Sequence, residues 1–220
     1  NLPLISWLIQ KGRCINCKTV ISIRYPLVEF ITAILFVIFM NSSPSLYNSS
    51  LNLIFHIFFS WLFLSLLICI TLIDIKSFWI PQGLINFGFL SGFLCLICIG
   101  FINNKFIDFN FLARGLSSSA ISFFIFESLR YFAKYIFKKD AIGKGDSKLV
   151  AMLCLWLGPL GTLFAVGFAY IFAAIYCLVG LSLNLLRFGK YIPFAPFLSL
   201  GGLLMWLVGN DFVIYNILRI

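Results

Sequence analysis

Long stretches without a charged residue alternate with short polar segments along the chain. Residues 51–73, 83–102 and 163–186 contain no Asp, Glu, Lys or Arg. An apolar helix of about 20 residues is long enough to cross the hydrocarbon core of a bilayer. The other hydrophobic segments are 27–43, 112–133, the short segment 149–157, which ends at Gly158-Pro159, and 194–214. The pattern predicts an all-α fold, a polytopic membrane helix bundle of about seven hydrophobic segments.

Composition excludes a water-soluble globular protein. Apolar residues make up 62% of the chain and charged residues 10%, and the mean hydropathy is +1.07. A soluble domain is nearer about 25% charged. The net charge of +9 would suggest a nucleic-acid partner in a soluble protein. In a membrane protein it instead reports orientation, so no nucleic-acid partner is expected.

The basic residues indicate which loops face the cytoplasm, because Lys and Arg are enriched on that side. If 149–157 and 163–186 are separate passes, one side receives Lys11, Arg13, Lys18, Arg24, Lys76, Lys134, Lys138, Lys139, Lys144, Lys148, Arg187 and Lys190. The opposite side receives Lys105 and Arg219. The predicted cytoplasmic segments are therefore 1–26, 74–82, 134–148 and 187–193, with 41–50 and 103–110 on the other side.

Two acidic residues stand at the predicted cytoplasmic edge of the membrane. Asp74 directly follows the segment 51–73, and Asp146 precedes the segment 149–157. One interpretation is that both are solvated interface carboxylates, paired with Lys76 and Lys148.

The other interpretation is that Asp74 and Asp146 form a catalytic pair. Two carboxyl groups at one site cannot easily both ionise, so they share a proton. The ionised group can then activate water while the neutral one polarises a peptide carbonyl, which is hydrolysis without a cofactor. Gly143 and Gly145 allow backbone conformations that bring the chain close to a substrate strand.

Several motifs carry a resemblance to a known family. Asp74 is followed seven residues later by Pro81, and Asp146 lies in Gly143-Lys144-Gly145-Asp146-Ser147-Lys148-Leu149. Three further motifs are Gly12-Arg13-Cys14-Ile15-Asn16-Cys17, Arg24-Tyr25-Pro26-Leu27-Val28-Glu29 and Ile192-Pro193-Phe194-Ala195-Pro196-Phe197. In this order the motifs resemble those of the type IV prepilin peptidases, membrane aspartic proteases of the Gly-x-Gly-Asp type.

The resemblance implies an activity and its residues. Asp74 and Asp146 would be catalytic, and the supporting motif residues would be Gly143, Gly145, Lys148 and Pro81. The family cuts a short basic leader from prepilins of type IV pili and from prepilin-like proteins of type II secretion systems. The cut lies at the cytoplasmic face of the bacterial inner membrane. Many members also methylate the new N-terminus with S-adenosylmethionine.

The cysteines depart from the family pattern. Bifunctional members carry two Cys-x-x-Cys pairs that bind zinc, and this chain has only Cys14 and Cys17 of that set. Two thiolates would leave a tetrahedral zinc site half complete, so zinc binding and methylation both stay open. We expect the chain to lack the family's N-terminal part. Residues 1–26 would then be a remnant of the cysteine-containing domain and 27–220 the peptidase domain.

Two alternatives use the same features. A degenerate, non-catalytic remnant or scaffold of this family would keep the motifs without the activity. A transporter could also contain intramembrane acids and Gly/Pro breaks in its helices. It ranks last, because neither hydropathy nor motifs show an internal repeat.

Overall fold

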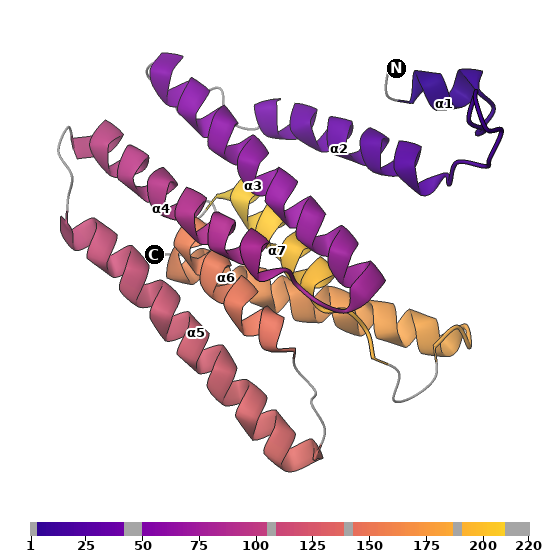
Figure 1. Cartoon of the computed structure of the whole chain (residues 1–220). Helices are drawn as coiled ribbons and strands as arrows, with labels where there is room; N and C mark the ends of the chain where they lie inside the picture. Colours follow the sequence, from indigo (N-terminus) through magenta and orange to yellow (C-terminus); the bar gives the residue numbers. More distant parts are fainter. Residues whose placement is uncertain (1–3, 42–49, 105–108, 139–142, 187–190, 210–220) are drawn as a thin grey trace. The chain divides into compact units, whose positions relative to one another are not determined.

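The computed structural model describes residues 4–41, 50–104, 109–138, 143–186 and 191–209. In these residues the chain forms seven α-helices (Figure 1), as predicted for an all-α fold. The helices are α1 (Ile5–Ile9), α2 (Arg24–Asn41), α3 (Ser50–Ser77), α4 (Gln82–Asn104), α5 (Phe109–Phe137), α6 (Lys144–Ser182) and α7 (Ala195–Val208).

Helices long and apolar enough to cross a membrane dominate the structure. Among the described residues they are Arg24–Asn41, Leu53–Ser77, Phe109–Ile136 and Lys144–Ser182. Helices α4 and α7 supply further, shorter apolar stretches. The protein is therefore a multi-pass membrane protein built from helices.

The chain divides into two compact units, residues 1–65 and 66–220. In the first unit, the indole nitrogen of Trp61 on α3 donates a hydrogen bond to the Phe36 carbonyl of α2 at 3.3 Å. The rings of these two residues also meet edge to face, with centroids 5.2 Å apart. These contacts join α2 to the first half of α3. The predicted domain boundary at residue 26 stays a prediction.

Helix α6 is the centre of the second unit and packs against α4, α5 and α7. Its first part is almost completely enclosed, since every side chain from residue 149 to 157 is buried. A helix whose side chains are apolar on every face is stable when all of its faces are buried. This explains why the short segment 149–157 shows no polar face.

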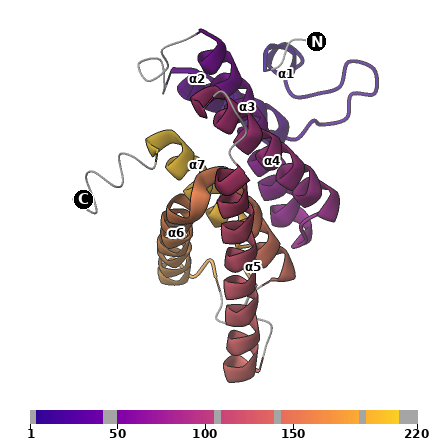
Figure 2. The ribbon, with the colours of Figure 1, turned by 90° about the vertical axis from the view of Figure 1, so that its left-hand side faces the viewer.

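Helix α6 is broken at Gly158-Pro159. Gly158 has φ 74° and ψ 174°, a backbone conformation open almost only to glycine. Pro159 cannot donate a backbone hydrogen bond to the preceding turn, while the Thr162 hydroxyl donates to the Gly158 carbonyl at 2.8 Å. Two arms, 144–157 and 159–182, diverge from this point (Figures 1 and 2). They correspond to the two segments that the sequence predicts as separate passes.

The connections at the predicted cytoplasmic segments 74–82 and 134–148 are shorter than predicted, whereas the connection between α6 and α7 is longer than the predicted 187–193. Helix α3 continues through Asp74 to Ser77, and α5 extends to Phe137. Helix α6 already begins at Lys144, inside the predicted loop 134–148. The first charged residues indicate where an apolar segment ends in the sequence. The backbone hydrogen bonds of the helix nevertheless continue for one or two more turns. As a result, both acids lie on helices rather than in loops.

Candidate active site

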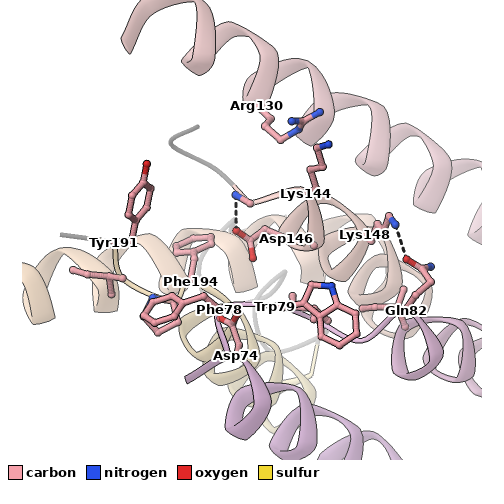
Figure 3. Close-up of a pocket in the computed structure, with 16 residues that line it drawn as sticks. Asp74, Phe78, Trp79, Gln82, Arg130, Lys144, Asp146, Lys148, Tyr191 and Phe194 are labelled. Atoms are coloured by element: carbon pink, nitrogen blue, oxygen red, sulfur yellow. Dashed lines mark hydrogen bonds between the residues drawn. The ribbon is translucent and has the colours of Figure 1, made fainter. Parts of the chain in front are cut away.

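A pocket of about 780 Å³ lies where several helix ends of the second unit meet (Figure 3). It is formed by the end of α3, the start of α4, part of α5, and the segments that begin α6 and α7. Asp74 and Asp146 both line it, and they lie close enough to interact electrostatically. The structure thus brings together the two acids that the sequence singles out.

Asp74 is held at the C-terminal end of α3. Helix α3 ends because Phe78 adopts a left-handed conformation with φ 51°, and its N–H donates to the Asp74 carbonyl at 2.9 Å. A residue in this conformation commonly ends a helix in this way. The Asp74 side chain is only 6% exposed. Its Oδ2 is buried and has no hydrogen-bond partner among the described residues, and the backbone of Ala195 lies close to the carboxylate.

Asp146 is held in the first turn of α6. Its Oδ2 accepts a hydrogen bond from the N–H of Gly143, the residue before the helix, at 3.2 Å. This is half of a capping box, and it fixes the carboxyl group over the helix N-terminus. The side chain is 7% exposed and points into the pocket (Figure 3).

The other predicted motif residues act on the backbone around the acids. A Cβ atom at Gly145 would lie 3.0–3.2 Å from three carbons of the Ile80 side chain, so Gly145 allows the segment after Asp74 to approach α6 closely. The Pro81 carbonyl accepts hydrogen bonds from the N–H groups of Leu84 at 3.1 Å and Ile85 at 3.3 Å. Pro81 therefore starts α4, and it does not itself line the pocket.

The interpretation of Asp74 and Asp146 as solvated interface carboxylates is wrong. Both side chains are buried, and neither forms an ion pair in the part of the chain that the structure describes. Lys148 instead donates a hydrogen bond to Gln82 Oε1, and Lys76 is exposed outside the pocket lining. Burial rather than solvation governs the chemistry of the two acids.

Sequence reasoning missed Arg130 as a pocket residue. Arg130 is 5% exposed, and its side chain pairs with Glu127, with Nε 3.1 Å from Oε2. The guanidinium carbon also lies 4.6 Å from the centroid of the Tyr131 ring. The spacing of Glu127 and Arg130 on α5 indicates a pair on one helix face. Only the packing of α5 on α6 turns that face toward the pocket.

Aromatic side chains form much of the remaining pocket wall. Phe78 and Trp79 come from the segment between α3 and α4, and Tyr191 and Phe194 from the segment before α7 (Figure 3). Phe78, Trp79 and Tyr191 are more than half exposed. The pocket therefore combines two buried acids with an accessible apolar wall.

Cys14 and Cys17 belong to the first unit and lie in a tight turn. The Cys14 N–H donates to the Thr19 carbonyl at 2.9 Å. The described residues contain no group of three or more His, Cys, Asp or Glu side chains that could hold a metal ion. A structural zinc site needs four ligands, so these two thiols alone do not fit one, and no chemical step is derived through zinc.

Cys17 is expected to be the fastest-reacting thiol of the described chain. Its side chain is exposed, and a hydrogen bond between Cys17 Sγ and the Thr19 hydroxyl at 3.0 Å, assisted by the Thr19 backbone and Cys14, lowers the pKa of Cys17 to about 7. Because the thiolate is the nucleophile, alkylation by iodoacetamide should rise steeply through pH 7. Peptide mass spectrometry after brief labelling measures this. Equal labelling of Cys14 and Cys17 would contradict it, and Thr19→Val should shift the rise to higher pH.

Comparison with known proteins gives consistent similarities. Residues 61–178 match the family model of the type IV leader peptidase family, and residues 1–42 match that of the bacterial peptidase A24 N-terminal domain. The chain is 35% identical over 209 residues to a prepilin leader peptidase/N-methyltransferase of Dichelobacter nodosus, covering 95% of this chain and 66% of that protein.

Other relatives agree. The chain is 32% identical over 207 residues to a type 4 prepilin-like proteins leader peptide-processing enzyme of Escherichia coli O78:H11, covering 92% of this chain and 68% of that protein. It is also 32% identical over 215 residues to a prepilin leader peptidase/N-methyltransferase of Aeromonas salmonicida, with coverages of 96% and 67%. The chain thus spans about two thirds of the length of these relatives. No solved structure matches it.

Proposed function

The chain belongs to the type IV leader peptidase family, and we propose that it is an aspartic endopeptidase that removes the leader from type IV prepilin-like proteins. The observation that carries the proposal is the burial of Asp74 and Asp146 in one pocket. Isolated interface acids would be solvated, whereas a buried pair of carboxyl groups has the arrangement needed for acid–base hydrolysis.

The proposed reaction uses the pair as one unit that shares a proton. The ionised carboxyl takes a proton from water as the water oxygen bonds to the scissile carbonyl carbon. The protonated carboxyl donates its proton to the carbonyl oxygen. The C–N bond then breaks as a proton passes to the leaving amine, and the pair returns to its starting state. The Oδ2 of Asp74 has no hydrogen-bond partner among the described residues, so its hydrogen-bonding capacity is not already used by the protein.

The proposed substrate enters from the cytoplasmic side of the bacterial inner membrane. The distribution of Lys and Arg along the sequence supports this orientation. The relatives' names refer to prepilin leaders, and we extend that substrate class to this chain. Its basic leader would lie in the cytoplasm, while its apolar helix would remain in the bilayer beside the aromatic wall of the pocket.

No cofactor is required by the proposed proteolysis. Methylation of the new N-terminus with S-adenosylmethionine is a separate proposal, whereas Cys14 and Cys17 alone do not complete a zinc site. Nothing in the described pocket depends on either. A chain can therefore cut prepilins whether or not it methylates them.

A cleavage assay tests the proposed function. The purified chain in lipid nanodiscs is incubated with a prepilin, and intact-mass spectrometry detects the shortened product. We expect a single cut at the junction of the basic leader and the apolar helix, without added metal. The mass of one methyl group on the product, upon addition of S-adenosylmethionine, would report methylation. A folded chain that never cuts would favour the alternative of a non-catalytic remnant or scaffold.

A further inference from the structure

We propose that Lys148 and Gln82 form a clasp that positions the two acids relative to each other. This inference rests on the proposed function and deepens it. Asp74 lies on α3 and Asp146 on α6, and no hydrogen bond joins the two side chains in the described structure. Their separation must therefore depend on contacts between the segments that carry them.

Two contacts in the described structure lie between those segments and bear on that separation. Gln82, the first residue of α4, follows the turn after Asp74, and Lys148 stands two residues after Asp146. Lys148 Nζ donates a hydrogen bond to Gln82 Oε1 across this junction (Figure 3). Beside it, the buried Ile80 side chain packs against the backbone at Gly145. The apolar contact between Ile80 and Gly145 lets the two segments approach closely. The hydrogen bond between Lys148 and Gln82 is directional, so it fixes how the two segments are aligned with each other.

The Gln82 amide is oriented for this role. Its Nε2 donates to Asn86 Oδ1 at 2.9 Å, one turn further along α4. Because an amide group has its oxygen and nitrogen on opposite sides, a bond made by the nitrogen turns the oxygen to the other partner. Asn86 thereby directs Gln82 Oε1 toward Lys148. This arrangement extends the clasp from α6 into the first turn of α4.

The two residues of the clasp allow the effect of geometry to be tested apart from the effect of charge. Lys148 brings a positive charge into the pocket with the two acids, so replacing it changes both the geometry and the field. Gln82 is neutral, and replacing it leaves every charge in place. The titratable groups around the acids that Gln82→Met leaves unchanged are Glu127, Arg130, Lys144, Lys148, Tyr170 and Tyr191.

The test compares Gln82→Met, Lys148→Met and the double variant with the wild-type chain on a prepilin. We expect each single variant to lower kcat on the order of 10- to 100-fold with little change in KM, because small misplacements of reacting groups have effects of this size. The double variant should lose no more than Lys148→Met alone, because both changes break the same bond. Lys148→Arg keeps both the positive charge and a donor for Gln82 Oε1 and should retain most of the activity.

The pH profile distinguishes positioning from general loss of structure. In a pair that shares a proton, the interaction between the carboxyl groups separates the two limbs of the bell-shaped profile. A looser pair should give a narrower bell in Gln82→Met. Partial unfolding would instead lower the whole curve without changing its width. Lys76→Met, which removes an exposed charge two residues from Asp74, serves as the charge-matched control and should behave as wild type.

The outcomes separate the clasp from the proposed function. If the wild-type chain cuts and Gln82→Met retains its kcat and the width of its pH profile, the clasp is wrong while the peptidase stands. Additive losses in the double variant also overturn the clasp. If the wild-type chain does not cut, or if cleavage survives the loss of either acid, the proposed function itself fails.

Discussion

Asp74→Asn and Asp146→Asn should each lower the rate of leader cleavage by ~10²–10⁴-fold, the range that positioned acid–base groups contribute. Asparagine has nearly the shape of aspartate but can neither hold nor release the shared proton. Because the two acids act as one unit, the double variant should be no slower than either single variant. Cleavage rates are measured by mass spectrometry on the same prepilin for all three variants.

Substrate binding and folding provide the controls for this prediction. Neither substitution changes the side-chain volume appreciably, so both variants should remain folded and still bind prepilin. The melting temperature in nanodiscs and co-purification of uncut prepilin check these points. If either variant still cuts at a near wild-type rate, the two acids are not the catalytic pair, and an aspartic mechanism must be abandoned.

Gly201→Ala should strongly destabilise the second unit. A Cβ atom at this position of α7 would lie 2.1 Å from the backbone carbonyl oxygen of Ala165 on α6. A backbone atom cannot move aside as a flexible side chain can, so α7 would have to shift away from α6. Overpacking of this kind costs about 1–3 kcal/mol. The shift would also displace Ala195, the first residue of α7, whose backbone reaches Asp74.

Thermal unfolding and cleavage rate measure the effect of Gly201→Ala, and Gly167→Ala is its matched control. Gly167 lies in the second arm of α6, and a Cβ atom there would meet no other atom within 4 Å. The helix should gain about 0.5–1 kcal/mol from this control substitution, since glycine is the less favourable residue in a helix. A melting temperature that falls equally in both variants would refute the role assigned to the close approach of α6 and α7.

The local features of the fold could be predicted from the sequence. The uncharged stretches predict the apolar helices, because whether a segment can cross a bilayer depends on its length and its apolar composition. Gly158-Pro159 predicts the break in α6. Glycine can adopt backbone conformations that other residues cannot, and proline has no backbone N–H to donate to the helix. Helix ends were less predictable, as the continuation of α3 through Asp74 shows, because hydrogen bonding does not stop where polarity begins.

The site was predictable only in part. Asp74 and Asp146 stood out because the chain is only 10% charged and both lie in recognisable motifs. Arg130 did not, because its spacing to Glu127 is equally suited to a pair facing elsewhere. Gln82 follows a motif proline, but nothing in its local sequence indicates that Lys148, far along the chain, donates to it.

The sequence by itself determined the class of the protein, its apolar helices and the identity of its two unusual acids. These depend on composition, length and local backbone chemistry, which neighbouring residues encode. The tertiary structure decided that the acids are buried together, that Lys148 contacts Gln82 rather than Asp146, and that Arg130 lines the same pocket. Such facts depend on how α4, α5 and α7 pack against α6, and on the end of α3 lying at the same pocket. Packing fixes distances between residues that the chain itself keeps far apart.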